Sequence, residues 1–209
     1  MKESKLLQYK IFRNLPENAK HIVKHIRSSE PARRVQSHVR NVSGAYPSKK
    51  MGMTIQFESH TLELAAIYLK EHAISVIEYY DQPPSFPIKY KTDKRVNGHL
   101  YTADFFVIEE DWIGWEEWKT EQELSLLSQK WPSRYVRNTD GSWSCPPAEQ
   151  YAENEGLSFR VCTEKNLPTT FIRNMRFLED YLHTSTVQIN DLSLQQINNY
   201  VKDNPGINV

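Results

Sequence analysis

The stretch "YTADFFVIEEDWIGWEEWKT", residues 101–120, decides the fold. Two runs rich in aromatic and β-branched residues predict neighbouring antiparallel strands, the second at residues 114–119. Because alternate side chains of a strand point to the same face, Glu117 and Lys119 would share one surface. This acid and this lysine form either a local ion pair or half of an active site.

The segments on both sides of this stretch predict a mixed α/β domain. Helical spacing of apolar residues and short β-rich runs alternate along the chain. The consecutive β-rich runs predict an antiparallel meander, and the order of elements predicts a mixed sheet covered by helices on both sides. In chain order, the predicted elements are helix 59–72, strands 74–82, 86–92, 99–111 and 114–119, helix 121–130, strand 157–165 and helix 167–182.

The charge distribution predicts how the chain is divided. Residues 1–50 contain 12 Lys and Arg against 3 Asp and Glu, which leaves a net charge of +9 there and −9 in the remainder. We expect a basic N-terminal arm at 1–50, an α/β domain at 51–183, and a helical segment at 184–209 that can begin a further domain. A basic arm suits phosphate binding, but a solvated helix face would explain the excess charge equally well. The expected phosphate contacts are Arg33, Arg34, Arg40, Lys49 and Lys50.

Composition limits the class of protein. With 209 residues, of which 39% are hydrophobic, the chain is long enough to bury a core. It has no apolar run long enough to span a bilayer and no secretory signal at its start, so we expect a cytosolic protein. Cys145 and Cys162 lack a C-x-x-C pair or matching histidines, so we expect partly buried, reduced thiols rather than a zinc site or a disulfide.

Three acids interrupt apolar patterns and are candidates for a site. Glu63 lies in the predicted helix, Asp104 in one predicted strand and Glu117 in the next. A charge in such surroundings costs desolvation energy unless it pairs or binds a cation. Carboxylate oxygens are the ligands that Mg²⁺ prefers, and Lys119 can orient or help deprotonate water and offset charge on phosphorus. The set therefore fits metal-dependent phosphodiester hydrolysis.

Each candidate also has a structural explanation when it is taken alone. Glu117 and Lys119 can form an exposed ion pair of little energetic value. Asp104 can end a strand, and Glu63 can face solvent from its helix. Glu58 is a rival to Glu63, although an acid at that position is explained by the helix dipole. Only the four residues Glu63, Asp104, Glu117 and Lys119, taken together in this order, favour a catalytic site over a structural explanation.

The order Glu63, Asp104 and Glu117-x-Lys119 on an α-β-β-β frame resembles the PD-(D/E)xK nuclease superfamily. The motifs "LELA", "TADFFV" and "EEWKT" that contain these residues are similar to those of TnsA, the endonuclease subunit of heteromeric transposases. The resemblance covers about residues 33–182. It implies a restriction-endonuclease-like mixed sheet flanked by helices, with the basic N-terminal arm and the start of a small helical C-terminal segment outside it.

The resemblance also implies roles for these residues. Glu63, Asp104 and Glu117 would ligate Mg²⁺, for which Mn²⁺ can substitute, and the backbone carbonyl of Trp118 would add a ligand. Lys119 would serve the attacking water. The TnsA prototype has glutamine where this chain has Glu117, and the acid favours metal binding further.

The activity implied by the resemblance is cleavage of the 5′ (non-transferred) strand at transposon ends in double-stranded DNA. A TnsB-like DDE transposase, separate or fused, would join the 3′ ends, and a TnsC-like AAA+ ATPase would regulate the reaction. We expect this in the prokaryotic cytoplasm, at the nucleoid when active, with no membrane partner. Two alternatives remain: a stand-alone restriction or repair nuclease of the same superfamily, and a non-catalytic DNA-binding scaffold in a transposition complex.

Overall fold

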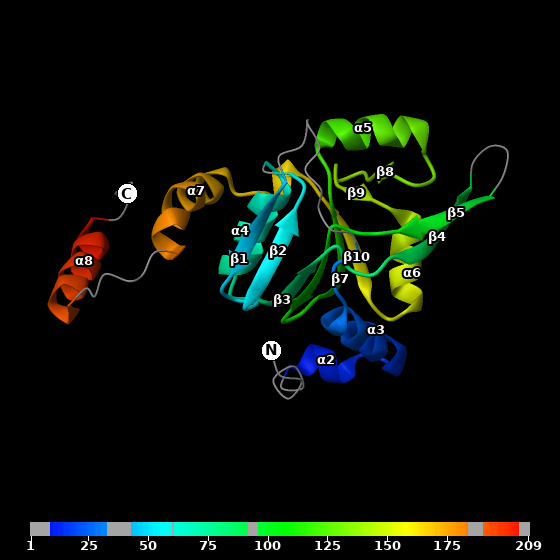
Figure 1. Cartoon of the computed structure of the whole chain (residues 1–209). Helices are drawn as coiled ribbons and strands as arrows, with labels where there is room; N and C mark the ends of the chain where they lie inside the picture. The colour runs from blue at the N-terminus through cyan, green and yellow to red at the C-terminus, as the bar shows by residue number, and fades with distance from the viewer. Residues whose placement is uncertain (1–8, 33–42, 60, 92–95, 184–189, 205–209) are drawn as a thin grey trace. The chain divides into compact units, whose positions relative to one another are not determined.

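The structure is a computed structural model of the chain (Figure 1), and its units differ from the predicted division at residues 50 and 183. The first compact unit comprises residues 1–172 and the second residues 173–209, and each is described by itself. The residues that the structure describes are 9–32, 43–59, 61–91, 96–183 and 190–204.

A four-stranded mixed sheet forms the centre of the first unit, in the order β10-β7-β6-β3 (Figure 1). β7 is antiparallel to β6 and parallel to β10, and β3 completes the sheet antiparallel to β6. Every residue of β7 is buried, which is expected for a strand inside the sheet that is covered on both faces. The strands are β3 (Val76–Asp81), β6 (Phe105–Glu109), β7 (Ile113–Trp118) and β10 (Ser158–Cys162).

The predicted meander is wrong in its pairing. The strand predicted at 99–111 is two strands, because the chain leaves the extended ladder at residues 102–104. β4 (Phe86–Lys91) and β5 (Val96–Tyr101) pair with each other in a separate hairpin, which extends away from the sheet in Figure 1. The period-two pattern shows that a segment is extended but does not identify its partner, so this separation could not be read from the pattern.

The N-terminal segment is not an arm over its described length. Phe12, Ala19, Val23 and Ile26 are buried in the same core as the sheet residues. The last three lie at the i, i+4, i+7 spacing of an amphipathic helix, and this spacing explains why that face is buried. The elements concerned are α2 (Lys10–Asn14) and α3 (Glu17–Ser28).

Further elements of the first unit contribute to the core around the sheet. Trp115 of β7 and Phe86 of β4 lie 5.0 Å apart between ring centroids, and Tyr151 of α6 stacks on Phe86 at 4.5 Å. The predicted helix at 59–72 begins only at Glu63. The bounds in the first unit are β1 (Gly44–Ser48), β2 (Met53–Phe57), α4 (Glu63–His72), α5 (Glu121–Lys130), β8 (Val136–Arg137), β9 (Trp143–Ser144), α6 (Pro146–Asn154) and η1 (Glu164–Asn166). α7 (Thr169–His183) crosses the division between the units, and α8 (Asp191–Asp203) belongs to the second unit.

Two expectations from composition can be compared directly with the structure. Cys145 and Cys162 are free and buried, as expected, and burial raises the pKa of each thiol to about 12. Within the described ranges, the chain has no helix with the length and apolar character needed to cross a membrane.

Candidate active site

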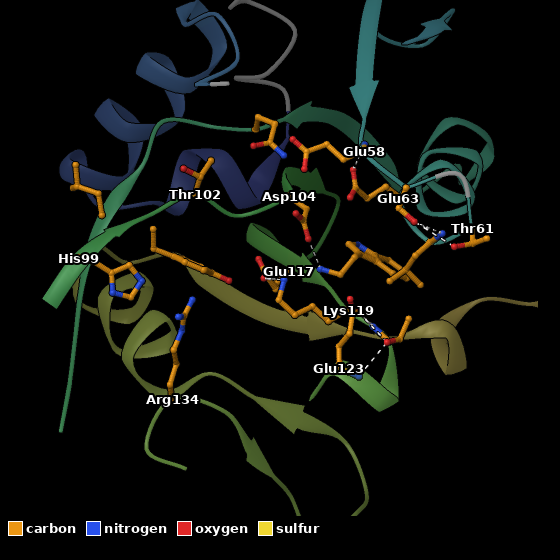
Figure 2. A pocket seen from close by; sticks show the side chains of 17 residues that line it. Glu58, Thr61, Glu63, His99, Thr102, Asp104, Glu117, Lys119, Glu123 and Arg134 are labelled. Atoms are coloured by element: carbon orange, nitrogen blue, oxygen red, sulfur yellow. Dashed lines mark hydrogen bonds and ion pairs between the residues drawn. The ribbon is translucent and has the colours of Figure 1, made fainter. Parts of the chain in front are cut away.

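A pocket of about 690 Å³ opens where α4 begins, β6 begins and β7 ends (Figure 2). Its lining includes the four candidates Glu63, Asp104, Glu117 and Lys119. Figure 2 shows their side chains around one shared space. The tertiary structure therefore brings together residues that are far apart in the sequence.

Glu63 is the first residue of α4, and the turn before this helix determines where its side chain lies. The amide of Glu58 donates a hydrogen bond to Oε2 of Glu63 at 2.8 Å, and the amide of Leu62 donates to Oγ of Ser59 at 3.2 Å. Burial and the nearby Glu58 and Glu117 carboxylates raise the pKa of Glu63 to about 7. Glu63 is thus close to half protonated at neutral pH. Its rival Glu58 lines the same pocket.

Asp104 lies immediately before β6 and not within a strand as predicted. Its amide donates to the carbonyl of Glu116 at 3.0 Å, which extends the β6–β7 ladder and places Asp104 level with Glu117. Its Oδ2 accepts a hydrogen bond of 2.7 Å from the amide of Trp118. Burial and then Glu117 raise the pKa of Asp104 well above its ordinary value, against the opposing effect of Lys119.

Glu117 and Lys119 form an ion pair on the pocket side of β7. The alternative of an exposed surface pair is wrong, because the Glu117 side chain is only 4% exposed. Oε2 of Glu117 is buried and has no hydrogen-bond partner in the described structure. Burial would lower the pKa of Lys119, but Glu117 and Asp104 outweigh it and raise the pKa. Lys119 is therefore a cation at neutral pH.

The donor set fits a hard divalent cation. The described ranges contain no group of three or more His, Cys, Asp or Glu side chains close enough to enclose a metal ion. Mg²⁺ keeps several waters and is usually bound through one or two carboxylates, so an open arrangement suits it. Glu117 supplies an oxygen without a partner in the described structure. Burial first, and neighbouring carboxylates after it, raise the pKa values of Glu63 and Asp104, and a bound cation would favour the charged form of both groups.

Comparison with protein families identifies the core of this unit. Residues 74–164 match the family model described as TnsA-like endonuclease N terminal. Residues 74–164 are thus similar to a TnsA-like endonuclease N-terminal domain. The match runs from before β3 to just after β10 and includes Asp104, Glu117 and Lys119, whereas Glu63 precedes it. A search of curated proteins finds no match.

Further residues line the pocket of this TnsA-like endonuclease domain and were missed from the sequence. Glu123 and Thr120 form a capping box at the start of α5, directly after Lys119. The T-x-x-E pattern could have revealed this helix start. Tyr101 and Arg134 have no comparable signal, because only the hairpin and the turn after α5 bring them to the pocket.

The predicted DNA contacts of the domain are only partly described. Arg33, Arg34 and Arg40 lie outside the described residues. Lys49 is exposed in the turn after β1, and its contact with phosphate stays a prediction.

Lys50 has a different role from the predicted one. Its ammonium group donates hydrogen bonds to the carbonyls of Lys70, Ala73 and Val76 at 2.6, 2.6 and 2.9 Å. Its three N–H donors are therefore used inside the protein, where they satisfy carbonyls at and beyond the C-terminal end of α4. The phosphate role predicted for Lys50 is replaced by this structural one.

Proposed function

We propose that this protein is a Mg²⁺-dependent DNA endonuclease that cleaves the 5′ (non-transferred) strand at transposon ends during cut-and-paste transposition. The observation that carries the proposal is the shared pocket of Glu63, Asp104, Glu117 and Lys119 beside and within a TnsA-like endonuclease domain. The acids supply metal ligands, and the lysine supplies a positive charge at the same place.

The arrangement of elements supports a restriction-endonuclease-like, PD-(D/E)xK-type site. α4 precedes three antiparallel strands, β3, β6 and β7, and Glu63 begins that helix. Asp104 and the Glu117-x-Lys119 pair lie at adjacent ends of β6 and β7. A helix acid, a strand-end acid and an acid-x-lysine pair therefore meet at the ends of the two inner strands, β6 and β7.

Each residue of the set has a role that its contacts suggest. Glu63, Asp104 and Glu117 would hold Mg²⁺ or Mn²⁺, and the carbonyl of Trp118 would complete the set. When bound, the metal would polarise the phosphoryl group and lower the pKa of a bound water. The backbone amide of Glu58 donates a hydrogen bond to one carboxylate oxygen of Glu63, and the backbone amide of Trp118 donates one to a carboxylate oxygen of Asp104.

Lys119 would act as a charge rather than as a base. Its raised pKa keeps it protonated at neutral pH, so it cannot accept a proton from water there. A fixed ammonium group in the pocket can orient the attacking water and stabilise the negative charge that develops on the phosphorus oxygens.

We further propose the partners implied by the family. A TnsB-like DDE transposase, separate or fused, would join the 3′ ends, and a TnsC-like AAA+ ATPase would regulate the reaction. Double-stranded DNA at the transposon ends would be the substrate, with Arg33, Arg34, Arg40 and Lys49 as phosphate contacts. The site of action would be the prokaryotic cytoplasm, at the nucleoid.

The proposal is tested by calorimetric titration of Mn²⁺ into wild type, Asp104→Ala and Glu110→Ala, followed by cleavage of transposon-end DNA with the cognate transposase. Glu110 is exposed in the β6–β7 turn, so Glu110→Ala removes a carboxylate away from the pocket. We expect Asp104→Ala alone to lose both Mn²⁺ binding and cleavage. Efficient cutting without a transposase would favour a stand-alone nuclease, and absence of cleavage in the complete wild-type system would favour a scaffold.

A further inference from the structure

Arg134 lines the pocket on the side away from Glu63 (Figure 2). It lies in the turn after α5, where its amide donates to the carbonyl of Trp131 at 2.9 Å. Tyr101, the last residue of β5, lines the pocket beside it. Neither residue belongs to the set of acids and lysine described above.

Aromatic rings hold the guanidinium group of Arg134 in place. Its Cζ lies 5.0 Å from the ring centroid of Tyr135, 5.2 Å from Tyr101, 5.6 Å from Trp131 and 5.9 Å from Tyr90. Ring faces attract a cation through their quadrupole but accept none of the in-plane hydrogen bonds of a guanidinium group. The rings therefore position Arg134 without neutralising its charge.

No carboxylate among the described residues pairs with Arg134, and its buried Nε has no hydrogen-bond partner there. Two other partly buried arginines show the contrast. Arg27 pairs with Glu78 at 2.9 Å, and Arg160 pairs with Glu109 at 2.7 Å. A guanidinium group that lines a pocket without a carboxylate partner is available to an anionic ligand.

The pocket also contains a second cation. Lys119 is already paired with Glu117, which leaves Arg134 as a lining cation with no acidic partner in the described structure. A DNA phosphate that lies away from a bound metal would otherwise meet mainly carboxylates. The carboxylates that line the pocket are Glu58, Glu63, Asp104, Glu117 and Glu123.

We propose that Arg134 binds a backbone phosphate of the DNA substrate, on the side of the pocket away from Glu63. The inference rests on the proposed endonuclease function and names a substrate contact of that same site. The planar fork of a guanidinium group matches two phosphate oxygens, and the ring cage keeps it oriented before DNA arrives. Arg134 thus fixes where the strand lies relative to the acids.

The test is fluorescence anisotropy with a fluorescein-labelled duplex in Ca²⁺, over a salt series, for wild type, Arg134→Gln and Arg137→Gln. Arg137 lies three positions away on the exposed β8 and outside the pocket, so it is the matched control. We expect Arg134→Gln to bind about tenfold more weakly, because it loses a charged hydrogen bond. The slope of log K against log salt should also decrease by about 0.9, the value for one phosphate contact.

Equal affinities and slopes for Arg134→Gln and Arg137→Gln would overturn the inference. If Arg134→Gln does not fold, Arg134→Lys replaces it in the test. Lysine keeps the positive charge but not the two-pronged guanidinium group, so we expect the wild-type salt slope with several-fold weaker DNA binding. Wild-type affinity of Arg134→Lys would refute the two-oxygen contact of the guanidinium group. Mn²⁺ titration separates this inference from the proposed function. If wild type and Arg134→Gln both bind Mn²⁺ while the two glutamine variants bind DNA alike, only the inference fails. If wild type binds neither Mn²⁺ nor DNA, both fail.

Discussion

Glu116 and Glu117 are consecutive residues of β7 and are 2% and 3% exposed, yet they lie on opposite faces in different surroundings. Glu116 accepts a hydrogen bond of 2.8 Å from the indole of Trp118 and pairs with Lys70 at 2.6 Å and with Arg160. Burial alone would raise its pKa, but Lys70 and Arg160 lower the pKa to about 2. The negative charge of Glu116 is therefore compensated by two cations and a hydrogen-bond donor, and we call this arrangement the compensated network.

Glu117 is not compensated in the same way. It pairs with Lys119 and leaves one buried oxygen without a partner in the described structure. Asp104 and Glu63, which share its pocket, have raised pKa values. The same residue type at the same depth thus has cations and an indole N–H around it on one face, and on the other has a single lysine and one buried oxygen without a partner in the described structure. A buried charge with all its partners indicates structure, whereas one without them indicates a ligand.

The two faces are connected through Trp118 and α4. The indole of Trp118 holds Glu116, while its backbone amide holds Asp104. Lys70, which pairs with Glu116, lies on the helix that begins with Glu63. The compensated network therefore positions the helix and the strand that carry the acids of the pocket.

The largest expected difference between the two glutamates is in cleavage. Glu117→Ala should lower the cleavage rate about 10³-fold, because it removes a group that stabilises charge at the reacting centre. Glu116→Ala, corrected for its folded fraction, should stay within about tenfold of wild type. Single-turnover cleavage of transposon-end DNA with the transposase measures both. Equal losses would abolish the distinction between the two faces.

Stability should reverse the ranking of the same two variants. Glu116→Ala should lower the free energy of unfolding by about 3 kcal/mol, because it leaves Lys70 buried without its carboxylate. Glu117→Ala should change it by less than about 1 kcal/mol, since it removes a carboxylate whose partner is partly exposed. Urea denaturation at pH 7 gives both values, and a smaller loss for Glu116→Ala would refute the framework role.

Asp104 sharpens the comparison through pH. Its folded pKa is raised, so wild-type stability falls as pH rises from the ordinary aspartate pKa through the folded one. Asp104→Asn removes this titration and should stabilise the protein at pH 8, with a smaller gain at pH 4. Asp140→Asn is the control, because Asp140 is exposed and its pKa is lowered by Ser142. Stabilisation by both variants would argue against a special environment for Asp104.

The smallest expected effect concerns cation affinity. Glu63 has a pKa of about 7 and must lose its proton to ligate a metal. Mn²⁺ affinity should therefore fall about tenfold between pH 8 and pH 6, as expected for one proton with this pKa. Calorimetric titration measures the decrease, and Glu63→Gln should remove it. A pH-independent affinity in wild type would exclude Glu63 from the ligand set.

Several features of the fold could be predicted because they depend on local patterns. Apolar spacing located α5 and α7, and the β-rich runs located β3, β7 and β10. The order of Glu63, Asp104, Glu117 and Lys119 indicated a TnsA-like domain, and the family match over residues 74–164 confirms the resemblance. The sequence could not predict that β4 and β5 pair only with each other, because the alternation of apolar and polar residues along a strand does not identify its partner strand.

The role of a charged residue depended on contacts that no local pattern contains. Lys50 resembles any basic residue in the sequence, but the fold places its ammonium group against three backbone carbonyls. Arg134 was overlooked because its ring cage is assembled from the β4–β5 hairpin and the turn after α5.

By itself, the sequence located several of the helices and strands around the site, among them α5, α7, β3, β7 and β10, and the four residues that carry the resemblance to an endonuclease, since both depend on residue types at short spacing. The tertiary structure alone decided which face of β7 each glutamate occupies, which cations reach it and which remain available in the pocket. The physical reason is that compensation of a buried charge depends on atoms within a few ångströms, and these come from segments distant in the chain.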